Sequence, residues 1–222
     1  MKEGKLVQLC RERQERDLRD GPSRGLFWDQ KAADRIVDFF QKYLRHSKGE
    51  WAGQRFELFD WQRDLVSKLF GTVKKDGYRQ YNVVYCAIPK KNGKSELAAG
   101  IALYLTFADG EPGGEIYSAA CDTDQARIVF DVAGQMIDNS KALGRKCKII
   151  RSTKRIIHNY TGSVYRVLSA DVPAKHGLNV HGVLFDELHA QPNRDLFDVL
   201  TIGTGDARRQ PVFFYITTAG YD

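Results

Sequence analysis

The chain has 222 residues, and its 34 Lys and Arg outnumber its 28 Asp and Glu, so the formal net charge is +6. The length suits one large α/β domain, and the 42% of hydrophobic residues supply a core, which excludes wholesale disorder. No apolar run approaches the ~20 residues of a membrane-spanning helix, and the first twenty residues are too charged for a signal peptide. The modest positive charge leaves nucleic-acid binding and an ordinary basic surface equally open.

The first third of the chain is predicted to be helical. Residues 1–20 are just over half charged and form a predicted helical arm, which ends at the turn residues 20–23. From Asp29 to Arg45 apolar residues recur every three or four positions, which predicts an amphipathic helix with Asp29 as its N-cap. A second helix is predicted from Asp60 to about Phe70.

Strands and helices alternate from residue 82 onward. Asn82–Ile88 is almost wholly apolar, which predicts a strand buried on both faces of a parallel sheet. Further strands are predicted at 115–120, 180–185 and 212–217, and helices at about 94–107, 123–137 and 192–202. Between them, three short runs within residues 147–169 predict a small antiparallel insertion. The alternation predicts an α/β fold with a mainly parallel central sheet flanked by helices.

The four cysteines, Cys10, Cys86, Cys121 and Cys147, are scattered along the chain and include no CxxC pair. This spacing predicts free thiols in a reducing cytosol and argues against a disulfide framework or a zinc site.

A candidate phosphate-binding loop joins the first of these strands to a helix. Its sequence is Ile88-Pro89-Lys90-Lys91-Asn92-Gly93-Lys94-Ser95. In such a loop the backbone N–H groups converge on an anion, and Gly93 permits the close approach. Lys94 is predicted to reach the β- and γ-phosphates, and the Ser95 hydroxyl to bind Mg²⁺. The general GxxxxGK[ST] pattern has Gly where Ile88 stands, so an ordinary strand–helix turn with a surface lysine is the alternative.

Two adjacent carboxylates, Asp186 and Glu187, end the predicted strand that begins at residue 180. This puts them at the carboxyl edge of the sheet, where α/β proteins bind ligands. Asp186 is predicted to hold the Mg²⁺ shell, and Glu187 to orient and deprotonate an attacking water. A strand capped by two solvated charges is the alternative. The phosphate loop upstream favours the functional interpretation, because both signals agree in order and position.

Two further motifs are weaker. Thr217-Thr218-Ala219-Gly220 ends the last predicted strand, where hydroxyls can sense the γ-phosphate and relay its loss. Phe59-Asp60-Trp61-Gln62 precedes the loop, and a glutamine amide can read the adenine edge while an aromatic ring stacks on the base. A strand-ending turn and core packing are the alternatives.

Four motifs in this order resemble one known family. They are FxLxxWQ (56–62), PKKNGKS (89–95), VLFDE (183–187) and TTAG (217–220). Together they resemble the ATPase domain of the large terminase of tailed bacteriophages, the motor that pumps DNA into a procapsid.

The resemblance implies a P-loop NTPase fold of the additional-strand, catalytic-glutamate type over residues 55–222, with residues 1–54 as a helical extension packed on it. It implies ATP and Mg²⁺ as cofactors. It also implies specific roles. Gln62, beside Trp61, contacts the adenine, and Lys94, Ser95 and Asp186 contact the phosphates and the metal. Glu187 is the catalytic residue, and the coupling residues are Thr217, Thr218, Ala219 and Gly220.

The expected partners follow from the same resemblance. They are double-stranded DNA, the portal protein, the small terminase subunit and further copies of the chain in a ring, with a monomer in isolation and no membrane. The expected location is the host cytoplasm, with transient docking on the procapsid. Family members carry a C-terminal nuclease domain; because this chain stops at Asp222, we expect nuclease activity to be absent from it.

One departure concerns the arginine that some terminases carry early in the loop, where this chain has Lys90. Lysine cannot form a bidentate fork with phosphate, which favours an arginine finger supplied in trans. Candidates are Arg208, Arg209 and the stretch Lys175–Gly177, with ordinary surface charge as the alternative. His189 is predicted to start a helix near the active site.

Basic residues also surround the antiparallel insertion, where they form either a solvated face or a track for DNA phosphates. They are Lys141, Arg145, Lys146, Lys148, Arg151, Lys154 and Arg155. Two rival functions stay open. A helicase-like ATPase would need a second RecA-like domain, for which the chain has no room, and a non-catalytic nucleotide-dependent assembly module would have no need of Glu187.

Overall fold

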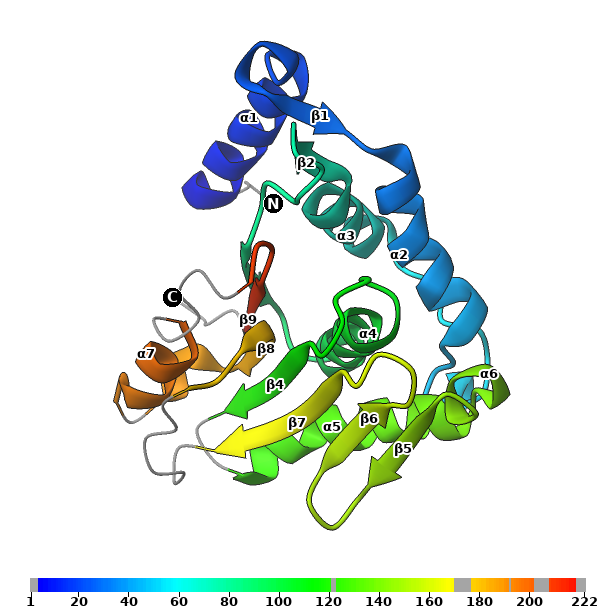
Figure 1. The fold of residues 1–222 in the computed structure, drawn as a ribbon. Coiled ribbons are helices and arrows are strands. Elements are labelled where there is room, and N and C mark those ends of the chain that lie inside the picture. The colour runs from blue at the N-terminus through cyan, green and yellow to red at the C-terminus, as the bar shows by residue number, and fades with distance from the viewer. Residues whose placement is uncertain (1–3, 121–122, 170–176, 192, 202–207, 219–222) are drawn as a thin grey trace.

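A computed structural model describes residues 4–120, 123–169, 177–191, 193–201 and 208–218. The N-terminal part is helical, as predicted, and Asp29 caps its second helix by accepting a hydrogen bond from the Ala32 N–H at 3.0 Å. A two-stranded antiparallel sheet that the sequence did not predict joins β1 to β2 (Figure 1). The elements in order are α1 (Lys5–Arg19), η1 (Pro22–Arg24), β1 (Leu26–Trp28), α2 (Gln30–Tyr43), η2 (Gly49–Trp51), α3 (Asp60–Gly71) and β2 (Thr72–Lys74).

Strands and helices then alternate as expected. The elements are β3 (Val83–Ile88), α4 (Lys94–Phe107), β4 (Glu115–Ala120), α5 (Thr123–Asp138), α6 (Lys141–Gly144), β5 (Cys147–Ile150), β6 (Arg155–His158), β7 (Val164–Ser169), β8 (Val180–Asp186), η3 (Leu188–Ala190), α7 (Asp195–Thr201) and β9 (Val212–Thr218). The predicted helix at 192–202 is therefore shorter, although residues 192 and 202 lie outside the described part of the chain.

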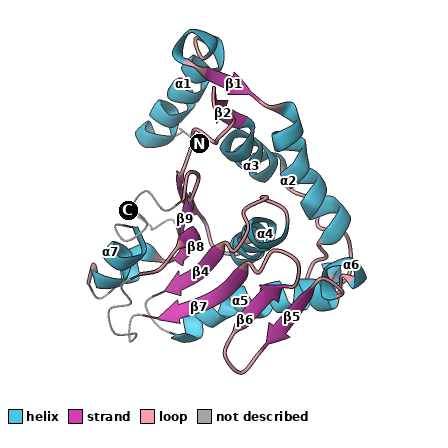
Figure 2. Ribbon diagram, in the orientation of Figure 1, coloured by secondary structure: helices cyan, strands magenta, loops and turns pink. Residues whose placement is uncertain are grey.

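Seven strands form the main sheet in the order β3-β9-β8-β4-β7-β6-β5 (Figure 2). The first five strands in this order, which are β3, β9, β8, β4 and β7, run parallel. β9 lies between the strand that leads into the phosphate loop and the strand that ends in Asp186. This is the additional strand, so the predicted P-loop NTPase fold of that type is confirmed.

Two details of the sheet differ from expectation. The meander of β5, β6 and β7 is antiparallel as predicted, but it continues the main sheet, because β7 also pairs in parallel with β4. The prediction that β3 is buried on both faces is wrong. β3 is an edge strand, and Val83 and Tyr85 on one of its faces are 58% and 64% exposed.

Helices cover both faces of the sheet. On one face α2, α3, α4 and α5 share a single core with inward side chains of the strands, and on the other face α7 covers a smaller cluster. α2 lies directly on α4, since a Cβ at Gly100 would come within 2.3 Å of the Phe40 ring. In the described residues no helix has both the length and the apolar character to cross a bilayer. Cys10, Cys86 and Cys147 are free thiols, and Cys121 lies outside the described residues.

Candidate functional site

The loop between β3 and α4 has the backbone of an anion-binding loop. Lys91 and Gly93 adopt left-handed conformations, with φ of 67° and 72°. The Asn92 side chain braces the turn by donating to the carbonyls of Pro89 and Lys90, both at 3.2 Å. Gly93 precedes the first residue of α4, Lys94, so the free N–H groups of the first helical turn point toward the loop.

Lys94 brings the two predicted motifs together. Its Nζ forms an ion pair with Glu187, lies 3.2 Å from Asp186 Oδ1 and donates to the Thr218 hydroxyl at 3.1 Å. These partners lie at the carboxyl ends of β8 and β9, beside the end of β3. Ser95 is the next residue of α4 and is partly buried. The structure therefore gathers Lys94, Asp186, Glu187 and Thr218 at one edge of the sheet.

Glu187 is held in a fixed position. Its Oε2 accepts from the Thr217 hydroxyl and from the Thr218 N–H, both at 2.9 Å, and its Oε1 accepts from the Thr218 hydroxyl. Its own backbone is left-handed, with φ of 51°, an uncommon conformation for a residue other than glycine that is frequently found at functional sites. The Glu187 N–H donates to the Ile216 carbonyl at 2.9 Å, which ties this turn to β9.

The two carboxyl groups have opposite pKa shifts. Burial raises the pKa of Glu187, but the hydrogen bonds from Lys94, Thr218 and Thr217 outweigh burial and lower that pKa to about 2. Burial raises the pKa of Asp186, and the nearby Lys94 only partly offsets this. In this arrangement Glu187 is a firmly ionised carboxylate.

The residues present fit the Mg²⁺ that the fold implies. The Asp186 side chain is 8% exposed, and its buried Oδ1 faces the Lys94 ammonium at 3.2 Å with no further polar partner among the described residues. A carboxylate oxygen and a hydroxyl such as that of Ser95 are the hard oxygen ligands that Mg²⁺ takes beside phosphates and water. The described residues contain no cluster of three His, Cys, Asp or Glu side chains able to hold a metal by themselves, and this mode of binding needs none.

Gln62 and Trp61 lie beside the loop, at the start of α3. Gln62 is buried, its Oε1 accepts from the Phe59 N–H at 3.0 Å, and its Nε2 lies 3.5 Å from the position of a Cβ on Gly93. Trp61 and Phe59 are 37% and 61% exposed, so their rings are available to a ligand.

Other predicted residues fall into three groups. His189 lies in η3 beside the site, with Nδ1 2.8 Å from the Thr217 hydroxyl, as the sequence led us to expect. Ala219, Gly220, Lys175 and His176 lie outside the described residues. Lys90 and Lys91 are exposed on the loop. A further residue beside the loop, Glu96, was not predicted: its carboxylate contacts His46 and Ser47, and no local signal in the sequence could reveal a contact across about fifty residues.

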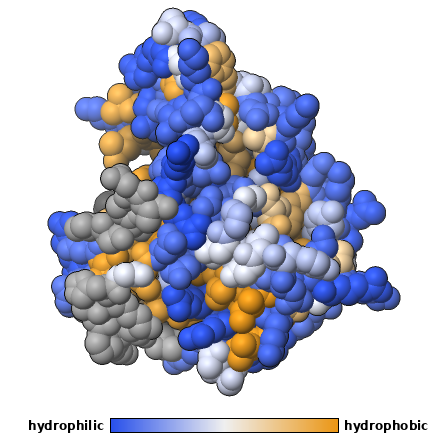
Figure 3. All heavy atoms as spheres, in the orientation of Figure 1, coloured by the Kyte–Doolittle hydropathy of each residue, from blue (hydrophilic) through white to orange (hydrophobic). Residues whose placement is uncertain are grey.

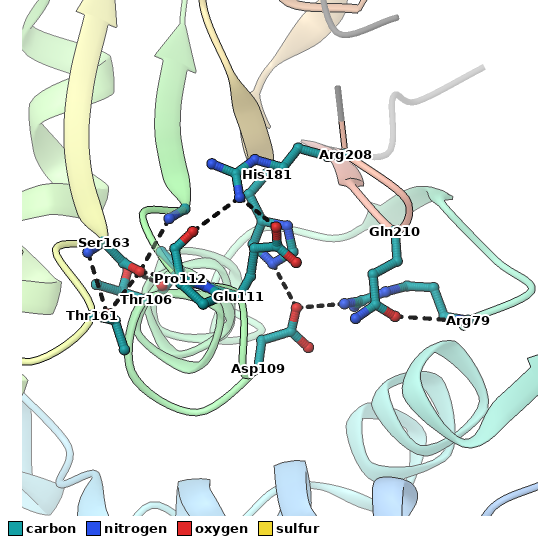
Figure 4. A network of polar contacts seen from close by, with 12 residues as sticks. Arg79, Thr106, Asp109, Glu111, Pro112, Thr161, Ser163, His181, Arg208 and Gln210 are labelled. Atoms are coloured by element: carbon teal, nitrogen blue, oxygen red, sulfur yellow. Dashed lines mark hydrogen bonds and ion pairs between the residues drawn. The ribbon is translucent and has the colours of Figure 1, made fainter. Parts of the chain in front are cut away.

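Arg208 and Arg209 precede β9 and therefore lie at the amino ends of the parallel strands, opposite the loop. Figure 4 shows Arg208 beside Glu111 and Pro112. The Arg208 guanidinium is fully engaged within the chain: it forms an ion pair with Glu111, donates to Asn179 at 2.7 Å, and donates to the carbonyls of Pro112 and Gly113 at 3.0 and 2.7 Å. Arg209 is exposed and contacts only the Tyr78 side chain among the described residues for which contacts are given. Neither arginine reaches Lys94 in the same chain.

Comparison with known proteins identifies the relatives of this chain. The sequence profile of the family "Terminase large subunit, ATPase domain" matches residues 60–222. The terminase large subunit of Enterobacteria phage HK97 is 28% identical over 188 residues, which are 83% of this chain and 36% of that protein. The crystal structure of the HK97 large terminase superposes with a TM-score of 0.71 at 27% identity, covering 84% of this chain and 38% of that one. A mutant ATPase domain of the Thermus phage P74-26 large terminase shares the fold, with a TM-score of 0.51 at 23% identity, over 63% of this chain and 60% of that one.

Proposed function

The chain belongs to the family of terminase large-subunit ATPase domains, and from this premise we propose that it hydrolyses ATP with Mg²⁺ to drive double-stranded DNA into a procapsid. The chain spans little more than a third of the length of the HK97 relative, so the activities of a whole terminase are part of this proposal. One observation carries it: Lys94, at the start of the loop helix, meets Asp186 and Glu187 at the carboxyl edge of a parallel sheet.

In the proposed reaction Lys94 exchanges its contact with Glu187 for a contact with the phosphates of ATP. The phosphates of ATP draw Lys94 away from Glu187, because a phosphate chain carries more charge than one carboxylate. Loss of the lysine contact raises the pKa of Glu187 and makes it a better base for the attacking water. Ser95 and Asp186 would hold Mg²⁺, which would supply positive charge to offset the negative charge of the transferred phosphoryl group.

Thr217 and Thr218 are proposed to report this exchange, together with Ala219 and Gly220. Both threonine hydroxyls donate hydrogen bonds to the Glu187 carboxylate, and both residues lie at the end of β9. A change at the γ-phosphate that moves Glu187 therefore reaches β9, the strand between β3 and β8, directly. Gln62 and Trp61 are proposed to hold the adenine, and the loop residues Pro89, Lys90, Lys91, Asn92 and Gly93 to surround the phosphates.

A basic residue from a neighbouring copy is proposed to complete the site. Arg209 is better suited than Arg208, since a trans contact by Arg208 would break its bonds to Glu111 and Asn179. Lys175–Gly177 stays a further candidate. We propose that copies form a ring in the assembled motor, that the portal protein and the small terminase subunit are partners, and that the motor acts in the host cytoplasm while docked on the procapsid. Residues 1–54 are proposed to act as an extension of the unit 55–222, in keeping with the core that α2 and α4 share.

The charge distribution supports a DNA-binding surface at the far edge of the sheet. Residues 139–170 contain eight Lys and Arg and no Asp or Glu, whereas the rest of the chain has 26 Lys and Arg against 28 Asp and Glu. The net positive charge of the protein thus comes from α6, β5, β6 and β7. β5 is the last strand of the sheet, and Figure 3 shows hydrophilic residues gathered on that side, around α6. We name the basic side chains of residues 141–155 the basic edge.

ATP turnover tests the hydrolytic site. Lys94→Ala and Glu187→Gln are expected to lower the ATPase rate at least a hundredfold, because they remove the phosphate clamp and the base. Asp38→Asn, which changes an exposed carboxylate on α2, is the matched control and is expected to keep the wild-type rate. Wild-type rates in folded Lys94→Ala and Glu187→Gln would refute the proposal.

DNA binding tests the basic edge. Alanine at Lys146, Lys148 and Arg155 is expected to weaken binding to duplexes of any sequence and to reduce the slope of log affinity against log salt by up to about three. The control is alanine at two exposed lysines of the N-terminal part, Lys31 and Lys75. Equal salt slopes for the two variants would mean that the basic edge serves only to prevent edge-strand pairing.

A further inference from the structure

A polar clamp joins the N-terminal part of the chain to the first turn of α4. One Glu96 oxygen accepts from the Ser47 N–H and from the Ser47 hydroxyl, both at 3.0 Å. The other lies 2.8 Å from His46 Nδ1. Both oxygens of the carboxylate are therefore occupied by two residues that lie about fifty positions earlier in the sequence.

The clamp residues are themselves held in place by a hairpin that follows α2. His46 exchanges backbone hydrogen bonds with Gln54 and Gly53 at 3.0 and 2.9 Å, and Gly53 supplies the left-handed turn with φ of 82°. The His46 ring stacks on Phe56 with centroids 4.5 Å apart, and Phe56 is buried against Phe40. The hairpin thus presents His46 Nδ1 and Ser47 from a rigid support.

The position of Glu96 in its helix makes this contact consequential. Gly93 is the N-cap of α4, so Glu96 is the third helical residue. A glutamate at this position ordinarily folds back onto the N-cap N–H, as in a capping box, and its charge is attracted to the helix N-terminus. In the phosphate-loop helix the same N–H groups are the ones that bind phosphate. A free Glu96 carboxylate would compete with nucleotide as an internal anion.

We propose that His46 and Ser47 are positioning residues for nucleotide binding, which hold the Glu96 carboxylate away from the phosphate-binding N–H groups. The proposal rests on the proposed nucleotide site at the loop. In the structure no side chain caps α4, and the carboxylate points instead to the hairpin. The N-terminal hairpin thereby sets the affinity of a loop that it does not itself form.

The test separates competition from simple stabilisation. His46→Phe keeps a ring to stack on Phe56 and Ser47→Ala keeps the backbone N–H, so this double variant removes two of the three contacts while preserving the hairpin. The probe is Mg-ADP, and its dissociation constant is measured by isothermal titration calorimetry with the full chain. We expect the double variant to bind Mg-ADP about tenfold more weakly, since it frees an anion at the helix N-terminus. Adding Glu96→Ala to it is expected to restore affinity to within about threefold of wild type.

The outcomes are distinct. A triple variant that binds as weakly as the double variant would overturn the proposal, because the clamp would then act only by stabilising the fold. Wild-type affinity in the double variant would overturn it as well. Lys94→Ala tests the nucleotide site itself. If this variant binds Mg-ADP like the wild type, the proposed nucleotide site is wrong. If it does not bind, the site stands, and the triple variant decides whether the clamp acts as proposed. Thermal unfolding checks that each variant is folded.

Discussion

Replacement of Glu187 by glutamine should change how stability depends on pH. Glu187 has an ordinary pKa of 4.5 and a pKa of about 2 in the folded chain, where Lys94, Thr217 and Thr218 stabilise its charge. Because the folded pKa is lowered, the stabilisation is present above pH 4.5 and is lost as the pH falls toward 2. It amounts to about 3 kcal/mol at neutral pH, of which about 2 kcal/mol disappears between pH 6 and pH 3.

Urea unfolding followed by circular dichroism at pH 6 and pH 3 measures this difference. Glutamine does not titrate, so wild type should lose about 2 kcal/mol more unfolding free energy than Glu187→Gln between the two pH values. Asp38→Asn removes an exposed carboxylate that is paired with Lys42, and its pH dependence should follow that of wild type within about 0.5 kcal/mol. If Glu187→Gln loses as much unfolding free energy between pH 6 and pH 3 as the wild type, the contacts around Glu187 do not stabilise its ionised form in solution.

Two further substitutions test the packing that supports the site. Gly100→Ala should cost about 1–3 kcal/mol in urea unfolding, because its Cβ would lie 2.3 Å from the Phe40 ring where α2 crosses α4; an unchanged midpoint would mean that the two helices separate at no cost. Asp109→Asn should cost about 3–5 kcal/mol, since it leaves the buried guanidinium of Arg79 without its ion-pair partner (Figure 4). A loss as small as that of the exposed pair at Asp38, at most about 1 kcal/mol, would contradict this account.

Much of the site could be predicted from sequence because its parts are local. Lys94 and Ser95 follow a strand and open a helix, and Asp186, Glu187, Thr217 and Thr218 end strands. In a parallel sheet all strands end at the same edge, so strand–helix alternation alone predicts that these residues converge. The start and end of α4 were likewise predicted, because the apolar run and the preceding glycine are local signals.

Other features depend on strand order and on contacts between distant segments, which no local pattern records. The apolar run 83–88 has the composition of a buried strand, but its place at the sheet edge exposes Val83 and Tyr85. Arg208 has the sequence context of an exposed arginine, yet the turn before β4 surrounds its guanidinium with acceptors.

The sequence by itself determined which chemical groups stand at the ends of the parallel strands, since that follows from the period and order of its elements. The tertiary structure alone decided how those groups are held: Lys94 between two carboxylates, Glu187 gripped by two threonines, and the Glu96 carboxylate turned toward His46 and Ser47. These contacts join segments about thirty to about ninety residues apart, and only the packing of the whole domain brings such segments within hydrogen-bond distance.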